Sequence, residues 1–371
     1  MPKRSTDELF QLVKSLEKAE KRNFKLFVQR NATSSDMKTV QLFDALDKLE
    51  DYDEEALLKR NTDIKKQQLS NLKAHLYRQI LASLRILKDD NNIQLQLHEL
   101  MDYSRILYDK GLYLQSLKTL DRVKEYAREQ HQVTYWLQTL IFEKKIEALY
   151  ITRSMENRAE TLAKEVEEAG DRLTMMNKLS NLSLQLYSWY INLGHARGDK
   201  DRIAIKAFFE SNLPTTAGLY NGFYEKHYQY ESYCWYGFIL QDLLMYYRYC
   251  QKWVDAFEQE PLMKKVDTPL YIKGLHNLLN AHFVLQNYDK FNTVLDKFEH
   301  FYHSKQANSN DNNRVQCFIY LYTAKLNKHF LEGSFTAGLK LIPEIEEKII
   351  EFRLKMDRHR VLVFYYKIAC L

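Results

Sequence analysis

A recurrent turn between two apolar-periodic helices is the feature that most constrains this fold. Around Gly111 one such helix ends, and a second begins within a few residues. The same arrangement returns along the chain. It predicts a stack of helical hairpins whose turns lie near Gly111, Ser154, Gly198, residues 251–253, residues 286–288 and Gly333.

The composition also favours helices. Only 10 Gly and 5 Pro leave little turn chemistry for an all-β fold, and Glu, Lys and Gln, which are good helix formers, fill the polar faces. The apolar share of 45% is too high for a disordered chain. Because 371 residues exceed the usual size of one compact core, we expect domains or elongation by repeats. The predicted fold class is all-α.

The sequence pattern changes at about residue 92. Residues 1–92 predict a helical N-terminal module that ends in one long amphipathic helix over residues 64–87. Residues 93–371 predict successive helix pairs. At the end, residues 358–371 have the pattern of the first helix of a seventh hairpin with no second helix after it. This is typical of a terminal lid or of a chain cut from a longer solenoid, and we favour the second interpretation.

Three hairpin centres share one spacing. A turn residue is followed two positions later by an aromatic residue, and five positions later by a residue that packs the second helix on the first. The matching segments are Gly111-x-Tyr113-x-x-Ser116, Gln251-x-Trp253-x-x-Ala256 and Gln286-x-Tyr288-x-x-Phe291. They resemble the hairpin centre of tetratricopeptide repeats, over about residues 93–371. The resemblance implies a right-handed superhelix of about six hairpins, in which the first helix of each pair lines the concave surface.

The candidate site follows from this resemblance. In tetratricopeptide domains that bind extended peptides, the position six residues before the turn often supplies asparagine, which can both donate and accept a hydrogen bond. Here that position holds Arg105, Asn192, Asn280 and Asn327, among others. Helical spacing adds neighbouring positions. The candidate peptide-binding residues are therefore His98, Arg105, Lys144, Asn192, Arg248, His276, Asn280 and Asn327.

Such a groove is polar and mildly basic, which suits a peptide backbone or a carboxylate. The sequence thus predicts a non-enzymatic scaffold that binds a protein or a peptide. The competing interpretation of the same asparagines is ordinary exposed helix surface.

Nucleic-acid binding is the alternative function. Residues 220–249 are dense in tyrosine and hold interleaved basic residues, which could stack the bases of a single strand. The N-terminal module adds basic positions on the helices expected near residues 14–25 and 65–88. We favour core packing for the aromatic residues, because a helix packed between two neighbours fills its interfaces with such rings. We also find no helix-turn-helix spacing in the module.

Several other classes are excluded or disfavoured. No phosphate-binding loop, dinucleotide motif, zinc-protease motif or nucleophile elbow occurs, so we expect no enzyme and no cofactor. His300 and His303 have the spacing of two zinc ligands, but a solvated helix end explains them better, and we expect no metal. The net charge of +5 does not require nucleic acid. The four cysteines form no paired motif, and no apolar run could enter a membrane, which favours a cytoplasmic protein.

Overall fold

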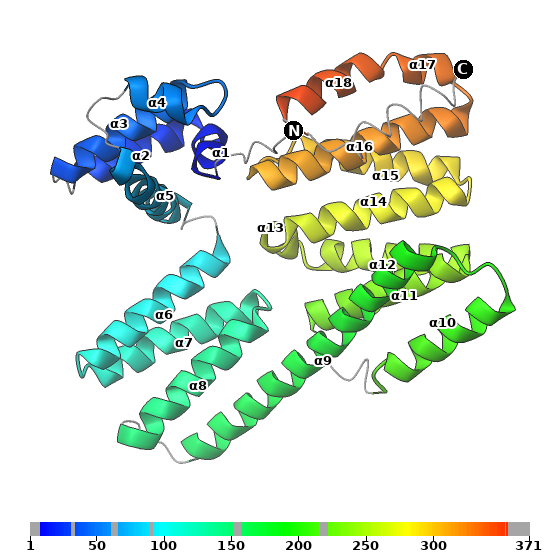
Figure 1. Ribbon diagram of the computed structural model, residues 1–371. Coiled ribbons are helices and arrows are strands. Elements are labelled where there is room, and N and C mark those ends of the chain that lie inside the picture. The colour runs from blue at the N-terminus through cyan, green and yellow to red at the C-terminus, as the bar shows by residue number, and fades with distance from the viewer. Residues whose placement is uncertain are drawn as a thin grey trace. The chain divides into compact units, whose positions relative to one another are not determined.

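The computed structural model describes residues 8–30, 34–60, 66–88, 92–150, 157–215, 222–352 and 354 (Figure 1). Every regular element in these ranges is a helix, which confirms the all-α prediction. The chain divides into two compact units, residues 1–102 and 103–371, and the division falls within one helix, α6 (Ile93–Asp109).

The first unit has a core of apolar side chains from its helices. Phe24 and Phe43 are fully buried, with ring centroids 4.6 Å apart, and Leu76 and Ile80 on the long helix are also inaccessible to solvent. These residues recur at helical spacing, so each helix buries one stripe and leaves its charged stripe outside. The helices before α6 are α1 (Glu8–Ser15), α2 (Lys18–Arg30), α3 (Ser34–Lys48), α4 (Glu54–Arg60) and α5 (Lys66–Lys88).

The second unit consists of helices that pack mainly on their neighbours in the chain. In particular, α11 packs on α9 and α12, α12 packs on α14, and α14 packs on α15 and α16. The expected superhelix of six regular hairpins stays a prediction. The helices are α7 (Tyr113–Glu129), α8 (Val133–Tyr150), α9 (Arg158–Leu193), α10 (Asp199–Asn212), α11 (Phe223–Leu240), α12 (Leu243–Gln259), α13 (Met263–Val266), α14 (Thr268–Val284), α15 (Tyr288–Tyr302), α16 (Asp311–Glu332), α17 (Phe335–Leu339) and α18 (Ile342–Glu351).

Five turns in the described part share one way of ending a helix. One or two residues after the helix, the backbone has a positive φ, and the next amide donates to the carbonyl oxygen five residues back, as Leu112 does to Leu107 at 2.9 Å. This pattern satisfies carbonyl groups that the helix end would otherwise leave without donors. The left-handed residues are Gly111, His131, Gln241, Gln286 and Gly333.

The expected turn at residues 251–253 is wrong. These residues lie inside α12, and Trp253 is fully buried, with its indole N–H donating to the carbonyl oxygen of Leu270 at 3.2 Å. The turn lies earlier, at Gln241, where Asp242 caps α12 by accepting a hydrogen bond from the amide of Met245. The spacing matched the repeat motif, but the aromatic residue fills the core.

The remaining expected turns have mixed outcomes. The structure has turns at Gly111, at Gln286 and at Gly333, and α10 begins after Gly198. The expected turn at Ser154 and the expected helix at residues 358–371 lie outside the described residues. A single helix of 36 residues, α9, replaces what would be two helices of successive hairpins.

The left-handed turns predict opposite effects of two substitutions. Gly333 has a φ of +66°, and an added Cβ would meet no atom within 4 Å, so Gly333→Ala tests backbone strain alone. We expect it to lower the free energy of unfolding by about 1 kcal/mol. Gln286 has a φ of 53°, so Gln286→Gly relieves the same strain and should leave the protein equally or more stable. Urea denaturation measures the free energy of unfolding of both variants. A stabilising effect of Gly333→Ala would contradict the left-handed conformation of Gly333.

Candidate functional site

Two parallel helices of the second unit, α14 and α16, present polar side chains on one face. The rings of His276 on α14 and Tyr320 on α16 stack with centroids 4.2 Å apart and planes 14° apart. Asn280 follows His276 by one helical turn, and Asn327 follows Tyr320 by two, so both carboxamides extend the same stripes. All four are half-buried. We call these residues, together with Lys273, the α14–α16 face.

Lys273 links this face to α11. Its ammonium group lies 2.6 Å from the carboxylate of Glu231, whose side chain is only 10% exposed, and its nitrogen lies over the ring of Trp253. Burial alone would raise the pKa of Glu231, but Lys273 and the His227 ring outweigh it and hold that pKa below its ordinary value. The carboxylate is therefore ionised at neutral pH, and it fixes the lysine in place.

The Asn280 carboxamide is held in one orientation. Its amide nitrogen donates to the hydroxyl oxygen of Tyr246 on α12 at 3.2 Å. A carboxamide has two donor hydrogens and an acceptor oxygen, so this bond leaves one hydrogen and the oxygen for another partner. A group oriented in advance loses less entropy when a ligand binds.

The charge on the α14–α16 face differs from the sequence-based expectation. Desolvation and the positive charge of Lys273 lower the pKa of His276 to about 4, so its ring is neutral at pH 7. The charge of Lys273 is balanced by Glu231. The face is therefore polar and close to neutral, not mildly basic, and suits an uncharged peptide backbone better than a carboxylate.

The tyrosine-rich segment lies in the core of the second unit. Within residues 222–249 every aromatic side chain is buried or half-buried, and the rings pack on one another, as Tyr233 and Tyr249 do with centroids 4.2 Å apart. Tyr220 lies outside the described residues. The exposed platform needed for base stacking is thus missing from the described segment.

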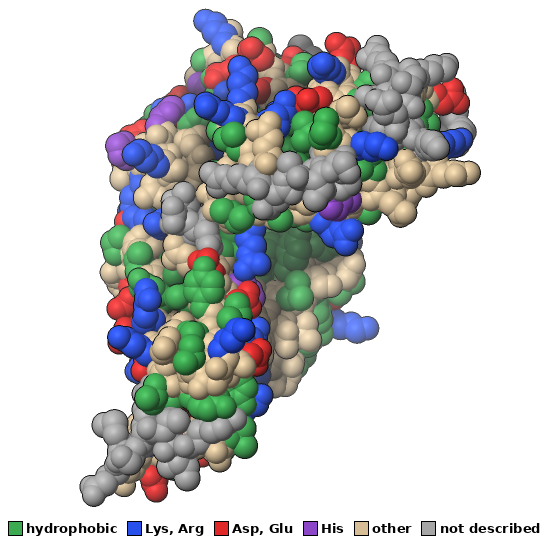
Figure 2. Space-filling model, turned by 90° about the vertical axis from the view of Figure 1, so that its left-hand side faces the viewer, with side chains coloured by type: hydrophobic (Ala, Val, Ile, Leu, Met, Phe, Trp, Pro, Cys, Tyr) green, Lys and Arg blue, Asp and Glu red, His purple; other side chains and the backbone are tan. Residues whose placement is uncertain are grey.

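The basic positions of the first unit are interspersed with acids. Lys18, Lys21, Arg22 and Lys25 line an open hollow of about 430 Å³ on α2, but Lys21 and Lys25 bond to Asp47 and Asp44 of α3 at 2.6 and 2.7 Å. Figure 2 likewise shows lysine and arginine side chains mixed with acidic ones over the face it draws. These charges form no continuous strip for a phosphate backbone.

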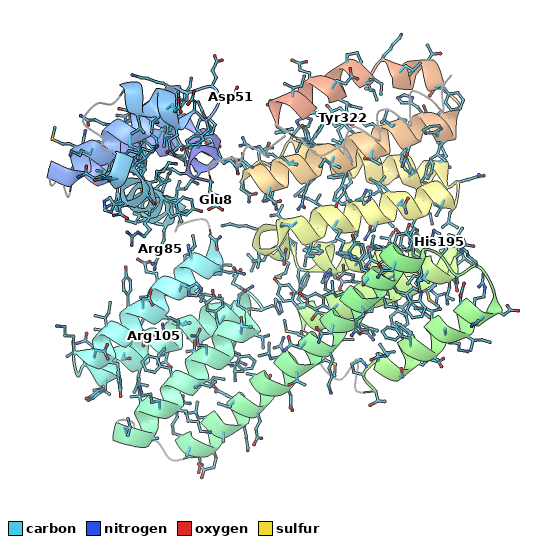
Figure 3. The ribbon with its side chains drawn as sticks, in the orientation of Figure 1. Glu8, Asp51, Arg85, Arg105, His195 and Tyr322 are labelled. Carbon is cyan, nitrogen blue, oxygen red and sulfur yellow. The ribbon has the colours of Figure 1, made fainter. Side chains whose placement is uncertain are left out.

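Four other predicted site residues lie on helices α6, α8 and α9. Arg105 is exposed on α6, as Figure 3 shows, and Lys144 is exposed on α8. Asn192 is exposed near the end of α9, where its amide donates to the hydroxyl of Ser188 at 3.4 Å. His98 is exposed on α6, within the first unit.

Arg248 points away from that face. It is exposed on α12 and lies two residues after Tyr246, which means about 200° around the helix from the hydroxyl that contacts Asn280. Arg248 was predicted as a peptide-binding residue because of the expected turn at residues 251–253, which is wrong. The structure therefore brings together only His276, Asn280 and Asn327 of the predicted set.

Sequence reasoning missed Trp235. With the turn at Gln241, the residue six before it is Trp235, which is half-buried on α11 and packs on Tyr187 with ring centroids 4.9 Å apart. Tyr187 itself is 43% exposed. The signal that could have found this position is Asp242, a preferred helix N-cap residue between two apolar runs. The Glu231–Lys273 pair had no local signal, because its members lie on different helices.

Neither a metal nor a membrane-spanning element is indicated in the described ranges. They hold no group of three or more His, Cys, Asp or Glu side chains that could bind a metal ion. His300 and His303 are exposed, and Glu299 forms an ion pair with Lys325 at 2.7 Å. Among the described helices, none is long and apolar enough to cross a membrane.

Comparisons of the chain with protein-family models, curated proteins and solved structures found no match.

A buried histidine on α11 predicts acid sensitivity. His227 is 1% exposed, its ring lies against Trp253, and no hydrogen-bond partner reaches either ring nitrogen. Burial lowers the pKa of His227 to about 4. The unfolded chain therefore binds a proton between about pH 6.5 and 4 that the folded chain excludes. We expect the free energy of unfolding to fall across this window, by about 3 kcal/mol from His227 alone.

Urea denaturation at several pH values between about 7 and 4.5 measures this loss. The matched variant is His227→Leu, which has a similar side-chain volume and no titratable group. Its free energy of unfolding should decline less steeply with acidification than that of the unmodified protein. An identical slope in both proteins would show that the folded state does not keep the His227 ring deprotonated in this pH range.

Proposed function

We propose that this chain is a non-enzymatic scaffold that binds a protein or a peptide, and that the α14–α16 face is its recognition surface. The observation that carries the proposal is the stack of His276 on Tyr320, which joins two helices into one face with Asn280 and Asn327 beside it. Carboxamides next to flat rings are suited to a peptide, because they pair with its backbone while the rings cover its side chains.

The resemblance to tetratricopeptide repeats supports the same function. In domains of that kind that bind extended peptides, asparagines occupy the position of Asn280 and Asn327. Because the face is close to neutral, the affinity for a peptide should depend more on packing contacts and hydrogen bonds than on charge. Ionic strength should therefore change the affinity little.

Nucleic-acid binding is the weaker proposal. It requires exposed rings beside unpaired basic groups, and the described part of residues 220–249 has its rings packed in the core.

The test is a double variant with a matched control. Peptides are selected on the purified protein from a random displayed library, and affinities are then measured for the unmodified protein and for Asn280→Ala with Asn327→Ala. Each lost carboxamide bond should cost about 1 kcal/mol, so the double variant should bind about 30-fold more weakly. Asn192→Ala removes the same group from α9 and should change affinity less than about twofold.

The outcomes separate the possibilities. Equal losses in the double variant and in Asn192→Ala would contradict a specific role for the α14–α16 face, as would no loss in either. A parallel pull-down from the native cell lysate, with and without nuclease, covers the alternative. Partners that disappear only after nuclease treatment would move the assignment to nucleic acid.

A further inference from the structure

Two buried thiols face each other across the α11–α12 hairpin. The Sγ atoms of Cys234 on α11 and Cys250 on α12 are 3.6 Å apart. Both residues are buried, at 3% and 0% exposure, within the core of the second unit. The pair lies on two helices that the tight turn at Gln241 joins, so its proximity is fixed by the fold.

We propose that Cys234 and Cys250 are a redox-active dithiol that peroxide oxidises to a disulfide, and that this oxidation weakens ligand binding at the α14–α16 face. The second part rests on the proposed function, whereas the first part does not.

The geometry needs only a small change. A disulfide requires sulfur atoms about 2.05 Å apart, so the two atoms must approach by about 1.5 Å. Rotation about the Cα–Cβ bonds and a slight closure of the hairpin supply this movement. Since Gln241 lies between the two cysteines in a tight turn, closure does not require the helices to part.

Tyr246 connects the dithiol to the α14–α16 face. It lies one helical turn before Cys250 on α12, and its hydroxyl accepts the hydrogen bond from Asn280. Tyr246 and Cys250 are both buried in the same core, and residues four apart share one face of a helix, so the thiol and the tyrosine ring are neighbours on α12. A movement of the Cys250 sulfur toward Cys234 alters the packing beside Tyr246, and we expect this to weaken the hydrogen bond that Tyr246 accepts from Asn280.

The oxidation is balanced with hydrogen peroxide. One cysteine, as its thiolate, attacks a peroxide oxygen; the O–O bond breaks, a sulfenic acid forms and hydroxide leaves, taking a proton to become water. The second sulfur then attacks the sulfenic sulfur and forms the S–S bond, and the departing oxygen leaves as a second water. The two thiols lose two electrons, and one peroxide becomes two waters.

Burial controls the rate of this reaction. It raises the pKa of the Cys234 thiol, so little thiolate is present at neutral pH. We therefore expect slow oxidation that accelerates as the pH rises, and poor reaction with bulky thiol reagents in the folded state.

Mass spectrometry tests the disulfide directly. Cleavage after Lys226, Arg248 and Lys252 places the two cysteines on separate tryptic peptides, residues 227–248 and 249–252. After peroxide treatment of the full chain, these two peptides should appear linked, and reduction should separate them. Cys250→Ser should abolish the link. Absence of the linked species in the folded, peroxide-treated protein would overturn the proposal.

Binding tests the coupling. With a peptide selected on the reduced protein, oxidation should lower affinity about fivefold, the effect of losing about one hydrogen bond. Tyr246→Phe should lower affinity to the same degree, and oxidation of Cys250→Ser should leave affinity unchanged. A disulfide without loss of affinity would overturn the coupling. If the reduced protein binds no peptide, the proposed function fails, but the linked peptides still decide whether the dithiol is oxidised.

Discussion

Burial of α11 on nearly every side is the constraint on which the second unit depends. This helix carries aromatic rings into the core together with the carboxylates of Glu225 and Glu231 and the imidazole ring of His227. A buried charge is costly unless a partner neutralises it. Arg172 of α9 bonds to Glu225 at 2.7 Å, and Lys273 of α14 bonds to Glu231 at 2.6 Å. These pairs fix the register of α9 and α14 on the helix between them.

The sequence predicted the helical class and the turns that contain Gly111 and Gly333, because glycine is an explicit signal for a left-handed helix end. It did not predict the turns at His131 and Gln241. These residues adopt the left-handed conformation only with the support of the surrounding structure, and neither residue type marks such a turn. The aromatic motif at Trp253 was misleading for a related reason: a large ring two positions after a polar residue fits a hairpin centre and a buried core position equally well.

The candidate site was predictable only in part. His276, Asn280 and Asn327 were found because their spacing from correct turns is a local property of the chain. The contacts of these residues could not be predicted, because their partners lie on other helices: Tyr320 stacks on His276, and Tyr246 accepts a hydrogen bond from Asn280. Those contacts hold the His276 ring and the Asn280 carboxamide in place, and the ion pair of Lys273 with Glu231 leaves the face close to neutral.

The unbroken helix α9 gives this chain a mechanical property that separate hairpins would lack. Its 36 residues extend about 54 Å without a joint. At one end Arg158 pairs with the buried Glu143 of α8, and beyond the other end the amide of Ala196 donates to the carbonyl oxygen of Ile239 on α11. Between these ends Arg172 of the same helix bonds to Glu225 of α11. A displacement where α8 meets α9 is therefore transmitted along one rigid element to the turn of the α11–α12 hairpin.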